Sequence, residues 1–573
     1  MKLNKAHIPT HLKKYVVNQN YDLYNSIDHA CWRFILTISV DFFSKYAHST
    51  YISGLKKTGI SINKIPRIET VNKKLKDFGW RAVCVRGFIP PNAFMEFQSL
   101  KILPIAADMR SHKHLTYTPS PDIVHEAAGH APIIANKDYS DYLSHYGEIA
   151  NKAIISNEDM NLYYAIRDLS DIKENINSKK TQIKKCENEL KKAYKQISYV
   201  SESAKLSRMN WWTVEYGLIG NKTNPKIYGA GLLSSVGESE NCLKKKVKKY
   251  LFNINCTKFK YDITEQQPQL FITPTFKKLT SELKKLSKSM SYKTGGLYGL
   301  RTGLKAQTLC TIEIDSLIQI SGLISHFKNT GHEINYIKMS GACQISYKNK
   351  QILNHGTNYH SNGYSTPIGN LKNYKKPIHE LNHSELTKLN IIKNGAVNLN
   401  FKKNICLKGT IKKIYKKNSR IIMITLSKCF VKQKNKTLYH ADWGDFDLIC
   451  GSKITSVYGG ASDKRNYYKN DTYDSNYQHY NKKIIIKNKV LNNYFKKIET
   501  LRKEKDIEKL FNLYQNINQN SINDWLLKYQ FLEVTNCNRK IKWINQIYRE
   551  LETISKNKSD LGRAIKRGLN IFK

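Results

Sequence analysis

Two histidines five positions apart, His125 and His130, stand in the stretch TPSPDIVHEAAGH and frame Glu126. Imidazole binds iron, copper, nickel or zinc, and two histidines with one carboxylate form an open site suited to non-haem Fe(II) and oxygen. In the zinc motif HExxH the histidines are four apart and share one helical face. Five residues turn about 140° around a regular helix, so these rings converge only if the helix starts at one or ends near the other. Pro-Asp at 121–122 fits such a helix start, and Gly129 fits such an end. Taken alone, the motif leaves open two unrelated histidines, one capping and one partly buried.

The carboxylate that could complete such a site is Glu215, in the stretch SRMNWWTVEYGLIG. Large apolar residues surround it in the sequence, and a carboxylate is costly to bury unless it is paired or bound to a cation. The alternative is an exposed glutamate on the polar side of an amphipathic helix. If Glu215 joins the histidines, then His125, His130 and Glu215 are the catalytic metal ligands.

Three motifs in this order, TPSPDIVHEAAGH, WWTVEYGL and YGAGLLSSVGE at 228–238, resemble the catalytic core of the pterin-dependent aromatic amino acid hydroxylases. The resemblance runs from about Ile27 to about Phe276, which is less than half of the chain. It implies a mainly α-helical catalytic domain and a monooxygenase that hydroxylates the ring of an aromatic amino acid. The cofactors it implies are Fe(II) and tetrahydrobiopterin or a related reduced pterin, with O2 as cosubstrate.

The resemblance also implies roles for single residues by their positions in the motifs. The residues implied at the pterin are Ile89, Phe94 and Glu126. The residues implied at the substrate carboxylate are Arg110, Thr118 and Ser234, and those around the substrate ring are Pro121, Trp211, Tyr216 and Ile263. Arginine suits a carboxylate because its planar fork donates two parallel hydrogen bonds.

The residues around the implied ring pocket point to more than one substrate. Trp211 matches the members of the family that act on phenylalanine and tyrosine, whereas Ile263 matches the tryptophan-hydroxylating members better. Tyr216 stands where many members have phenylalanine. We expect conversion of L-phenylalanine to L-tyrosine, with tryptophan hydroxylation by the same mechanism as the alternative. A zinc-dependent hydrolase that uses Glu126 as its base is a third interpretation of the HExxxH motif.

The segment between His130 and Glu215 is about twice as long as in the animal members of the family. Its apolar residues alternate by three and four, as in a coiled coil, at Leu169, Ile172, Ile176, Ile183, Cys186, Leu190, Ala193, Ile197 and Val200. One straight helix over 169–200 would carry the chain about 48 Å away from Glu215. We therefore predict a helical-hairpin insertion over about 160–206 that turns near 175–178 and supports homo-oligomerisation or covers a neighbouring domain.

The remaining chain shows no recognisable chemistry. We predict a catalytic domain over 1–290, a β-rich domain of unknown role over 291–485 and a helical C-terminal region over 486–573. The segment GGLYGLRTG at 295–303 lacks the GK[ST] ending of a phosphate loop and is interpreted as a linker. The segment HGTNYHSNGY at 355–364 also has two histidines five apart, but no carboxylate pattern is nearby, so a metal site is not favoured there.

The amino-acid composition limits which partners the protein is expected to bind and in which cellular compartment it is expected to work. The formal net charge is +48, but only 15 of the 94 basic residues are arginine, the residue that base and phosphate recognition favours. We therefore expect no specific nucleic acid as partner. No stretch approaches the roughly 20 apolar residues of a membrane span, and the 11 cysteines form no CxxC pair. These features predict a cytoplasmic protein with reduced thiols that binds no membrane.

Overall fold

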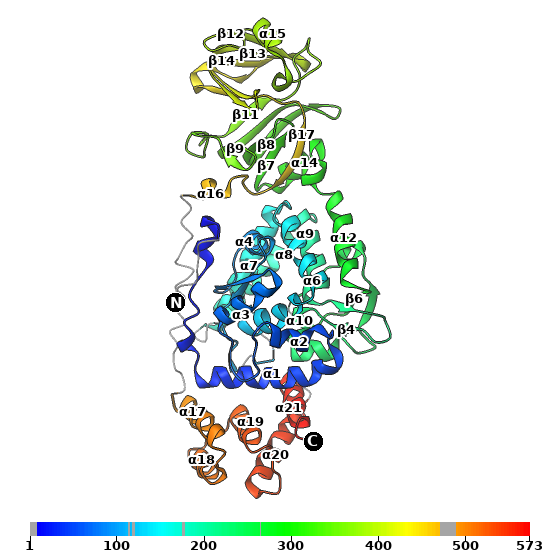
Figure 1. Cartoon of the computed structure of the whole chain (residues 1–573), viewed down its shortest axis with the longest axis vertical. Helices are drawn as coiled ribbons and strands as arrows, with labels where there is room; N and C mark the ends of the chain where they lie inside the picture. The colour runs from blue at the N-terminus through cyan, green and yellow to red at the C-terminus, as the bar shows by residue number, and fades with distance from the viewer. Residues whose placement is uncertain are drawn as a thin grey trace.

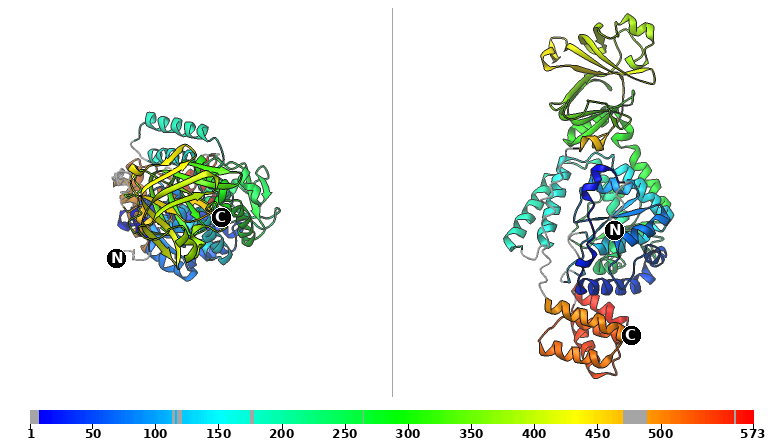
Figure 2. Two further views of the ribbon diagram at one scale, coloured as in Figure 1. Left: turned by 90° about the horizontal axis from the view of Figure 1, so that it is seen from above. Right: turned by 60° about the vertical axis from the view of Figure 1, so that its left-hand side comes forward.

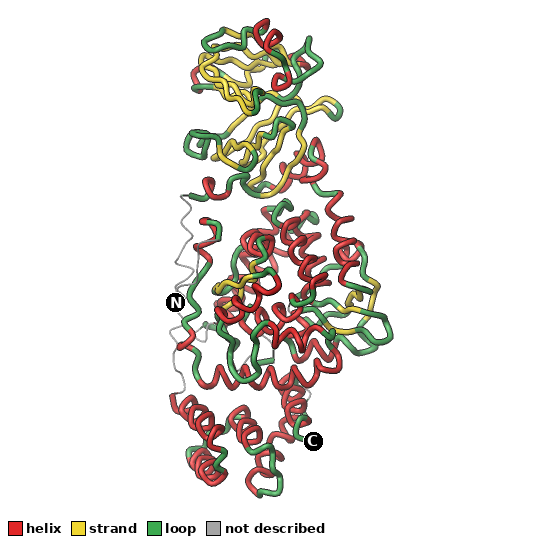
Figure 3. Tube along the Cα trace, viewed as in Figure 1, coloured by secondary structure: helices red, strands yellow, loops and turns green. Residues whose placement is uncertain are grey.

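The computed structural model describes residues 8–573 except 113–114, 117–120, 175–177, 264, 470–488 and 558. Its elements form three groups along the long axis of the molecule (Figure 1). A mainly helical part lies in the middle, a β-rich part at one end and the C-terminal helices at the other, as the distribution of strands also shows (Figure 3). Thr118 and most of the predicted turn at 175–178 lie outside the described residues.

The central part is mainly α-helical, as predicted. Its α-helices are α1 (Ser26–Tyr46), α2 (Thr50–Lys57), α3 (Ile68–Leu75), α4 (Pro91–Ser99), α5 (Ala131–Ile134), α6 (Lys137–Ala150), α7 (Asn157–Glu174), α8 (Lys180–Gln196), α9 (Glu202–Asn210), α10 (Ala230–Leu233), α11 (Val236–Asn241) and α12 (Phe276–Lys288). The 3-10 helices are η2 (Thr10–Tyr15), η3 (Tyr21–Leu23), η4 (Lys76–Phe78) and η8 (Ile254–Lys258). Two segments, η6 (Val124–His130) and η7 (Trp211–Glu215), are π-helices.

Two small sheets complete the central part. Strands β1 (Arg81–Val85) and β2 (Ile102–Ala106) pair in parallel. The second sheet has the order β4-β3-β6-β5, with β3 (Leu218–Ile219), β4 (Lys226–Ile227), β5 (Lys248–Leu251) and β6 (Gln269–Thr273). Because β2 leads into the loop before η6 and β3 follows η7, the sheets fix the chain on either side of the two π-helices.

The C-terminal helices share a hydrophobic core with the central part. They are α17 (Lys489–Glu504), α18 (Ile507–Gln519), α19 (Trp525–Val534), α20 (Lys542–Ser555) and α21 (Asp560–Asn570). The ring of Phe34 on α1 lies 4.7 Å from that of Tyr529 on α19. The buried Arg33 guanidinium, also on α1, forms ion pairs with Glu499 at 3.0 Å and Glu533 at 3.1 Å. These helices therefore cover the outer side of α1.

The β-rich part contains two antiparallel sheets, each with its own hydrophobic cluster. The first has the order β10-β9-β8-β7-β17, with β11 also on β9, and its strands are β7 (Leu309–Ile314), β8 (Ile318–Thr330), β9 (Glu333–Tyr347), β10 (Lys350–Gln351), β11 (Tyr364–Pro367) and β17 (Ile454–Gly459). The second has the order β12-β13-β14-β15, with β16 also on β14, and its strands are β12 (Ala396–Phe401), β13 (Ile405–Lys417), β14 (Arg420–Gln433), β15 (Lys436–Tyr439) and β16 (Phe446–Ile449). The short helices of the β-rich part and its flanking segments are α13 (Ser291–Thr294), η9 (Ile378–Glu380), α15 (His383–Lys388), η10 (Lys402–Asn404), η11 (Ala441–Trp443) and α16 (Lys464–Tyr467).

The interpretation of GGLYGLRTG as a linker is wrong. The segment forms most of helix α14 (Gly296–Ala306), which packs on the first β-rich sheet. Leu297, Leu300 and Leu304 recur at helical spacing and contact that cluster. At Gly303 an added Cβ would lie 2.6 Å from the Ile324 side chain, so this glycine allows the helix to approach the sheet closely.

Helices α7 and α8 lie side by side at the edge of the molecule (Figure 2). The Lys173 ammonium and the Glu187 carboxylate pair across them at 3.1 Å. At the far end of α8, the backbone N–H and hydroxyl of Ser198 donate to Glu158 at 2.8 and 2.6 Å. The described residues of α7 and α8, with Ser198 just beyond α8, thus contact each other at both ends of the pair.

Two further properties follow from the described residues. None of their helices has the length and apolar content that crossing a bilayer requires. All eleven cysteines are free thiols, and most of them are buried.

Candidate metal centre

His125 and His130 converge because their segment is a π-helix rather than a regular α-helix. A π-helix has i→i+5 hydrogen bonds, and its wider turn brings residues five apart to one side. The Nε2 atoms of the two rings lie 3.2 Å apart. Asp122 caps the start as expected, since its Oδ1 accepts the His125 N–H at 3.0 Å. The predicted helix end near Gly129 is wrong, because α5 continues directly from His130.

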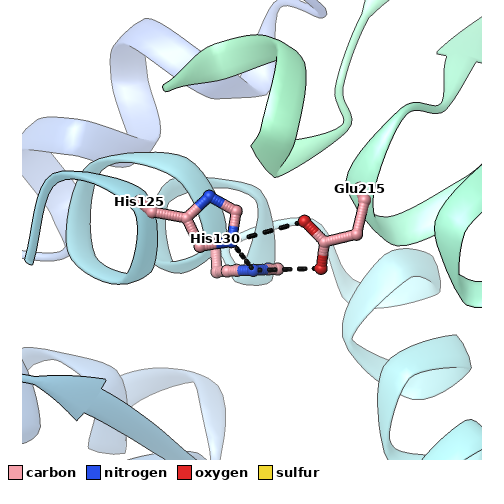
Figure 4. A group of neighbouring side chains, drawn as sticks. All are labelled: His125, His130 and Glu215. Carbon is pink, nitrogen blue, oxygen red and sulfur yellow. Dashed lines mark hydrogen bonds and ion pairs between the residues drawn. The ribbon is translucent and has the colours of Figure 1, made fainter. Parts of the chain in front are cut away.

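Glu215 reaches both histidines from the end of η7 (Figure 4). Its Oε2 lies 3.3 Å from His125 Nε2, and its Oε1 lies 3.4 Å from His130 Nε2. The small residues of YGAGLL permit this approach: a Cβ added to Gly229 would lie 2.4 Å from the Glu215 carbonyl oxygen. The structure thus joins two segments that are 85 positions apart in the chain.

A layer of buried polar groups supports the histidines. The Ser234 hydroxyl lies 2.9 Å from His125 Nδ1. Arg110 donates two hydrogen bonds to Asp122, at 2.7 and 2.9 Å, and a third to the Ser234 carbonyl at 3.0 Å. Since Asp122 also caps η6, one ion pair links the start of the π-helix to the Ser234 segment. Sequence reasoning identified Asp122 only as a helix cap and missed its pairing with Arg110.

The pKa values of His125, His130 and Glu215 depend strongly on one another and on burial. Burial alone would lower the pKa of His125, but the neighbouring Glu215 carboxylate more than offsets this and raises it to about 9. Burial lowers the pKa of His130 to about 4. Burial likewise opposes ionisation of Glu215, yet the two imidazoles hold its pKa below the usual value. A cation that binds here would displace the proton from the His125–Glu215 pair.

Glu126 projects from the same π-helix and is almost fully buried. Burial raises the pKa of its carboxyl group to about 8. Its Oε2 atom accepts no hydrogen bond from any described residue. A buried polar atom without a partner is costly in a finished site, so this atom is free to accept a hydrogen bond from a bound molecule.

The donor set fits a transition-metal ion. Two imidazole nitrogens and a carboxylate oxygen lie within 4.8 Å of one another and come from three side chains. If His125 Nδ1–H donates to Ser234, its Nε2 carries the lone pair that a metal requires. Two histidines and one carboxylate with open positions suit non-haem Fe(II).

The other predicted site residues lie in three places. Trp211 stacks on Tyr216 at 4.6 Å and on Tyr261 at 4.3 Å between ring centroids, directly beside Glu215. Tyr261 was missed by sequence reasoning, although it stands two residues before Ile263. Pro121 and Ile263 are half-buried, and Ile89 and Phe94 belong to a small hydrophobic cluster that includes Val83 and Val85. Hydrogen bonds and ion pairs therefore bring together six of the predicted residues, His125, His130, Glu215, Glu126, Ser234 and Arg110, and the aromatic stack includes Tyr216, which directly follows Glu215.

The chain matches one family model, described as biopterin-dependent aromatic amino acid hydroxylase, over residues 18–160 and 197–330. The gap in the match falls on α7 and α8. The match ends beyond the sequence resemblance noted above, within β8.

Several characterised relatives are similar to this chain. Phenylalanine-4-hydroxylase of Chromobacterium violaceum is 27% identical over 270 residues, which cover 46% of this chain and 75% of that protein. Phenylalanine-4-hydroxylase of Pseudomonas aeruginosa is 26% identical over 258 residues, or 45% of this chain and 81% of that protein. A crystal structure of the Chromobacterium violaceum enzyme with iron(III) and 7,8-dihydrobiopterin is 25% identical, covers 48% of this chain and 85% of that one, and has a TM-score of 0.38.

Proposed function

We propose that this chain, whose residues 18–160 and 197–330 belong to the biopterin-dependent aromatic amino acid hydroxylase family, is a phenylalanine 4-monooxygenase. It converts L-phenylalanine to L-tyrosine with O2, non-haem iron and tetrahydrobiopterin or a related reduced pterin. The observation that carries this proposal is the meeting of His125, His130 and Glu215 at one point, within the residues that the family model matches.

In the proposed reaction, His125, His130 and Glu215 hold the iron. Bound Fe(II) and the two electrons of the reduced pterin supply the oxygen chemistry that closed-shell organic groups cannot perform alone. Ser234 orients His125 through Nδ1, so that Nε2 faces the metal. The buried Glu126 carboxyl group, whose Oε2 has no hydrogen-bond partner among the described residues, is proposed to form a hydrogen bond with the pterin, and Ile89 and Phe94 are proposed to contact the pterin ring.

The substrate is proposed to lie beside the aromatic stack of Trp211 and Tyr216, with Pro121 and Ile263 completing the ring pocket. Its carboxylate is proposed to bind Arg110, with Thr118 and Ser234. Arg110 is fixed by Asp122 through its Nε and Nη2 atoms, so the carboxylate would share the guanidinium with that pair. A pre-organised arginine loses little freedom on binding a carboxylate.

An activity assay tests the proposal. The full-length chain, loaded with Fe(II) and supplied with oxygen and tetrahydrobiopterin, is incubated with Phe, Trp or Tyr in parallel. Tyrosine formation from phenylalanine that Glu215→Ala abolishes is the expected result. Tryptophan hydroxylation alone would favour the alternative substrate within the same mechanism. Absence of hydroxylation from all three substrates by an iron-loaded protein would refute the proposal.

Self-association through the α7–α8 insertion is proposed as well. The exposed Tyr164 and Tyr194 on these helices are what supports it, because large apolar side chains on a surface are often covered by a partner. Removing 160–206 and joining the ends with a short linker should lower the number of chains per particle, which is the mass measured by light scattering divided by the mass of one chain. An unchanged number of chains per particle and unchanged stability would contradict this proposal.

The cytoplasm is the proposed compartment, and the free, mostly buried thiols support it. Fractionation of cells that express the tagged chain would test this location.

A further inference from the structure

The β-rich part contains a second cluster of two histidines and one carboxylate, made of His355, His360 and Asp447. All three are buried, with side-chain exposures of 3%, 8% and 1%. The histidines come from the loop between β10 and β11, which belongs to the first sheet. Asp447 lies on β16 of the second sheet, 87 positions after His360, so no local sequence pattern indicated it.

The three donor atoms surround one point. His355 Nδ1 lies 3.3 Å from His360 Nε2 and 3.6 Å from Asp447 Oδ2, and His360 Nε2 lies 3.9 Å from the same oxygen. Both nitrogen–oxygen distances exceed the length of a hydrogen bond. A point equidistant from the three atoms in their plane lies about 2.1 Å from each, which matches the length of a zinc bond to nitrogen or oxygen.

The atoms of His355 and Asp447 that face away from the common point already have hydrogen-bond partners. His355 Nε2 lies 2.8 Å from the Tyr415 hydroxyl, and if Nε2–H donates to it, the lone pair falls on Nδ1. The Thr425 hydroxyl donates to Asp447 Oδ1 at 2.5 Å, which leaves Oδ2 facing the histidines. Metal-binding histidines and carboxylates typically have such hydrogen-bond partners on their far side.

Burial makes an unoccupied cluster expensive. Moving a carboxylate out of water costs several kcal/mol unless a cation or good hydrogen bonds compensate for it. The side chains of Thr425 and Tyr359 form hydrogen bonds with the Asp447 carboxylate. Among the described residues no lysine or arginine lies at ion-pair distance from Asp447, and its ion-pair partners are the two histidines. A divalent cation at the common point would balance the carboxylate and satisfy both imidazoles.

We propose that His355, His360 and Asp447 bind a divalent transition-metal ion, with Zn²⁺ as the best-fitting species, and that this ion ties the two sheets of the β-rich part together. Imidazole and carboxylate suit zinc, and three protein donors leave the fourth position of a tetrahedral zinc ion to a water molecule. The burial of all three side chains leaves little access for a substrate, so we assign the ion a structural role. The ring of Tyr359 lies edge-on to both imidazoles, at 5.1 and 4.7 Å between centroids, and helps to close the site.

The test uses the full-length chain with the first cluster disabled. In a His130→Ala, Glu215→Ala background, the chain is stripped with a chelator, dialysed against Zn²⁺ and analysed for bound metal. The expected result is about one Zn²⁺ per chain and a higher melting temperature with Zn²⁺ than without. A background protein that is folded by circular dichroism but binds no Zn²⁺ would overturn the proposal and leave a purely hydrogen-bonded cluster.

Variants of the second cluster assign the ion to its ligands. Adding Asp447→Ala should remove the bound Zn²⁺ and its thermal shift. Adding His332→Ala, which changes an exposed histidine in the turn between β8 and β9, should change neither. If Asp447→Ala does not fold, His360→Gln is the deciding variant, because it keeps a polar side chain of similar length. Zinc retained by a folded ligand variant would place the ion elsewhere and contradict the proposal.

Discussion

Twice in this chain, histidines five residues apart meet a carboxylate more than eighty positions downstream, yet the two clusters differ in access. Side-chain exposures are 21% for His125 and 16% for Glu215 in the first cluster, against 3% for His355 and 1% for Asp447 in the second. Open sites admit substrates, whereas closed sites hold structural ions. Both clusters have two histidines at the same spacing and one carboxylate, so the comparison teaches that ligand type and spacing alone do not separate a site open to substrate from a closed one.

The neighbouring groups that hold the ligand side chains in place also differ between the two clusters. The first rests on the buried Arg110–Asp122 ion pair and the Ser234 hydroxyl. The second rests on the Tyr415 and Thr425 hydroxyls. A π-helix brings the first pair of histidines together, and a loop between strands brings the second pair together. The following changes test these differences.

Metal removal should separate the clusters most strongly. Because only the first cluster is open to substrate, chelation should abolish tyrosine formation, and Fe(II) but not Zn²⁺ should restore it. Tyrosine is measured by chromatography, with metal content measured in the same samples. Activity that persists in a protein shown to be free of iron would contradict the claim that the first cluster works through bound iron.

Asp122→Asn should have the next largest effect. It leaves the buried Arg110 charge without its partner, and breaking such a pair destabilises a protein by about 3–5 kcal/mol. Denaturant unfolding of the variant and of the unaltered chain measures the loss. As a control, Asp141→Asn removes a carboxylate from an exposed pair with Lys137 and should have an effect of at most about 1 kcal/mol. Equal losses in the two variants would contradict a supporting role for the buried pair.

Ser234→Ala removes the hydroxyl that orients His125, and such outer partners contribute roughly 10–100-fold to metal affinity or activity. We expect iron affinity and kcat to fall within that range. Tyr415→Phe, the matching change at the second cluster, should weaken Zn²⁺ binding and leave kcat unchanged. A Ser234→Ala enzyme with normal iron affinity and only a raised KM for phenylalanine would assign Ser234 to the substrate instead.

The smallest predicted effect concerns a contact between the central part, which contains the first cluster, and α16, which follows the last strand of the β-rich part. Glu96 on α4 accepts from Lys464 on α16 at 2.9 Å and contacts His11 at 2.8 Å. Burial alone would raise the pKa of Glu96, but His11 and Lys464 more than offset this and hold it below its usual value. A lowered carboxyl pKa adds stability above the unfolded pKa, and this stability is lost as pH falls through the folded pKa.

Glu96→Gln should therefore cost about 1.5 kcal/mol at pH 7, as expected for a hydrogen bond to a charged group. The difference from the unaltered chain should shrink as the pH falls below the ordinary glutamate pKa of 4.5 and through the lower folded pKa of Glu96. Urea unfolding at several pH values measures it. A difference that stays constant across this range would show that the charge of Glu96 is not involved.

The sequence predicted the central fold and the first cluster well, because chemistry and periodicity coincide there. Three motifs in the right order marked His125, His130 and Glu215 and the helical fold around them. The π-helix could not be predicted, since no residue preference distinguishes one wide turn from an α-helix. The α14 helix was misjudged because its glycines were considered only as a phosphate-loop pattern, whereas Gly303 allows the helix to pack closely on the sheet.

The second cluster could not be predicted, because its carboxylate depends on how two sheets meet. Asp447 stands in the strand FDLI, and all residues of this strand, β16, are buried. An aspartate in a buried strand is a signal in itself, but only the fold shows that it faces His355 and His360. Local patterns thus supplied the histidine pairs, and tertiary structure supplied the distinction between them.

Tyrosine formation from phenylalanine by three forms of the full-length chain tests the central claim most directly. The unaltered chain, Glu215→Ala and Asp447→Asn are each assayed with Fe(II), oxygen and tetrahydrobiopterin at a temperature where all three are folded. The account predicts no activity for Glu215→Ala and nearly full activity for Asp447→Asn. Activity that survives Glu215→Ala but is lost in Asp447→Asn would contradict it.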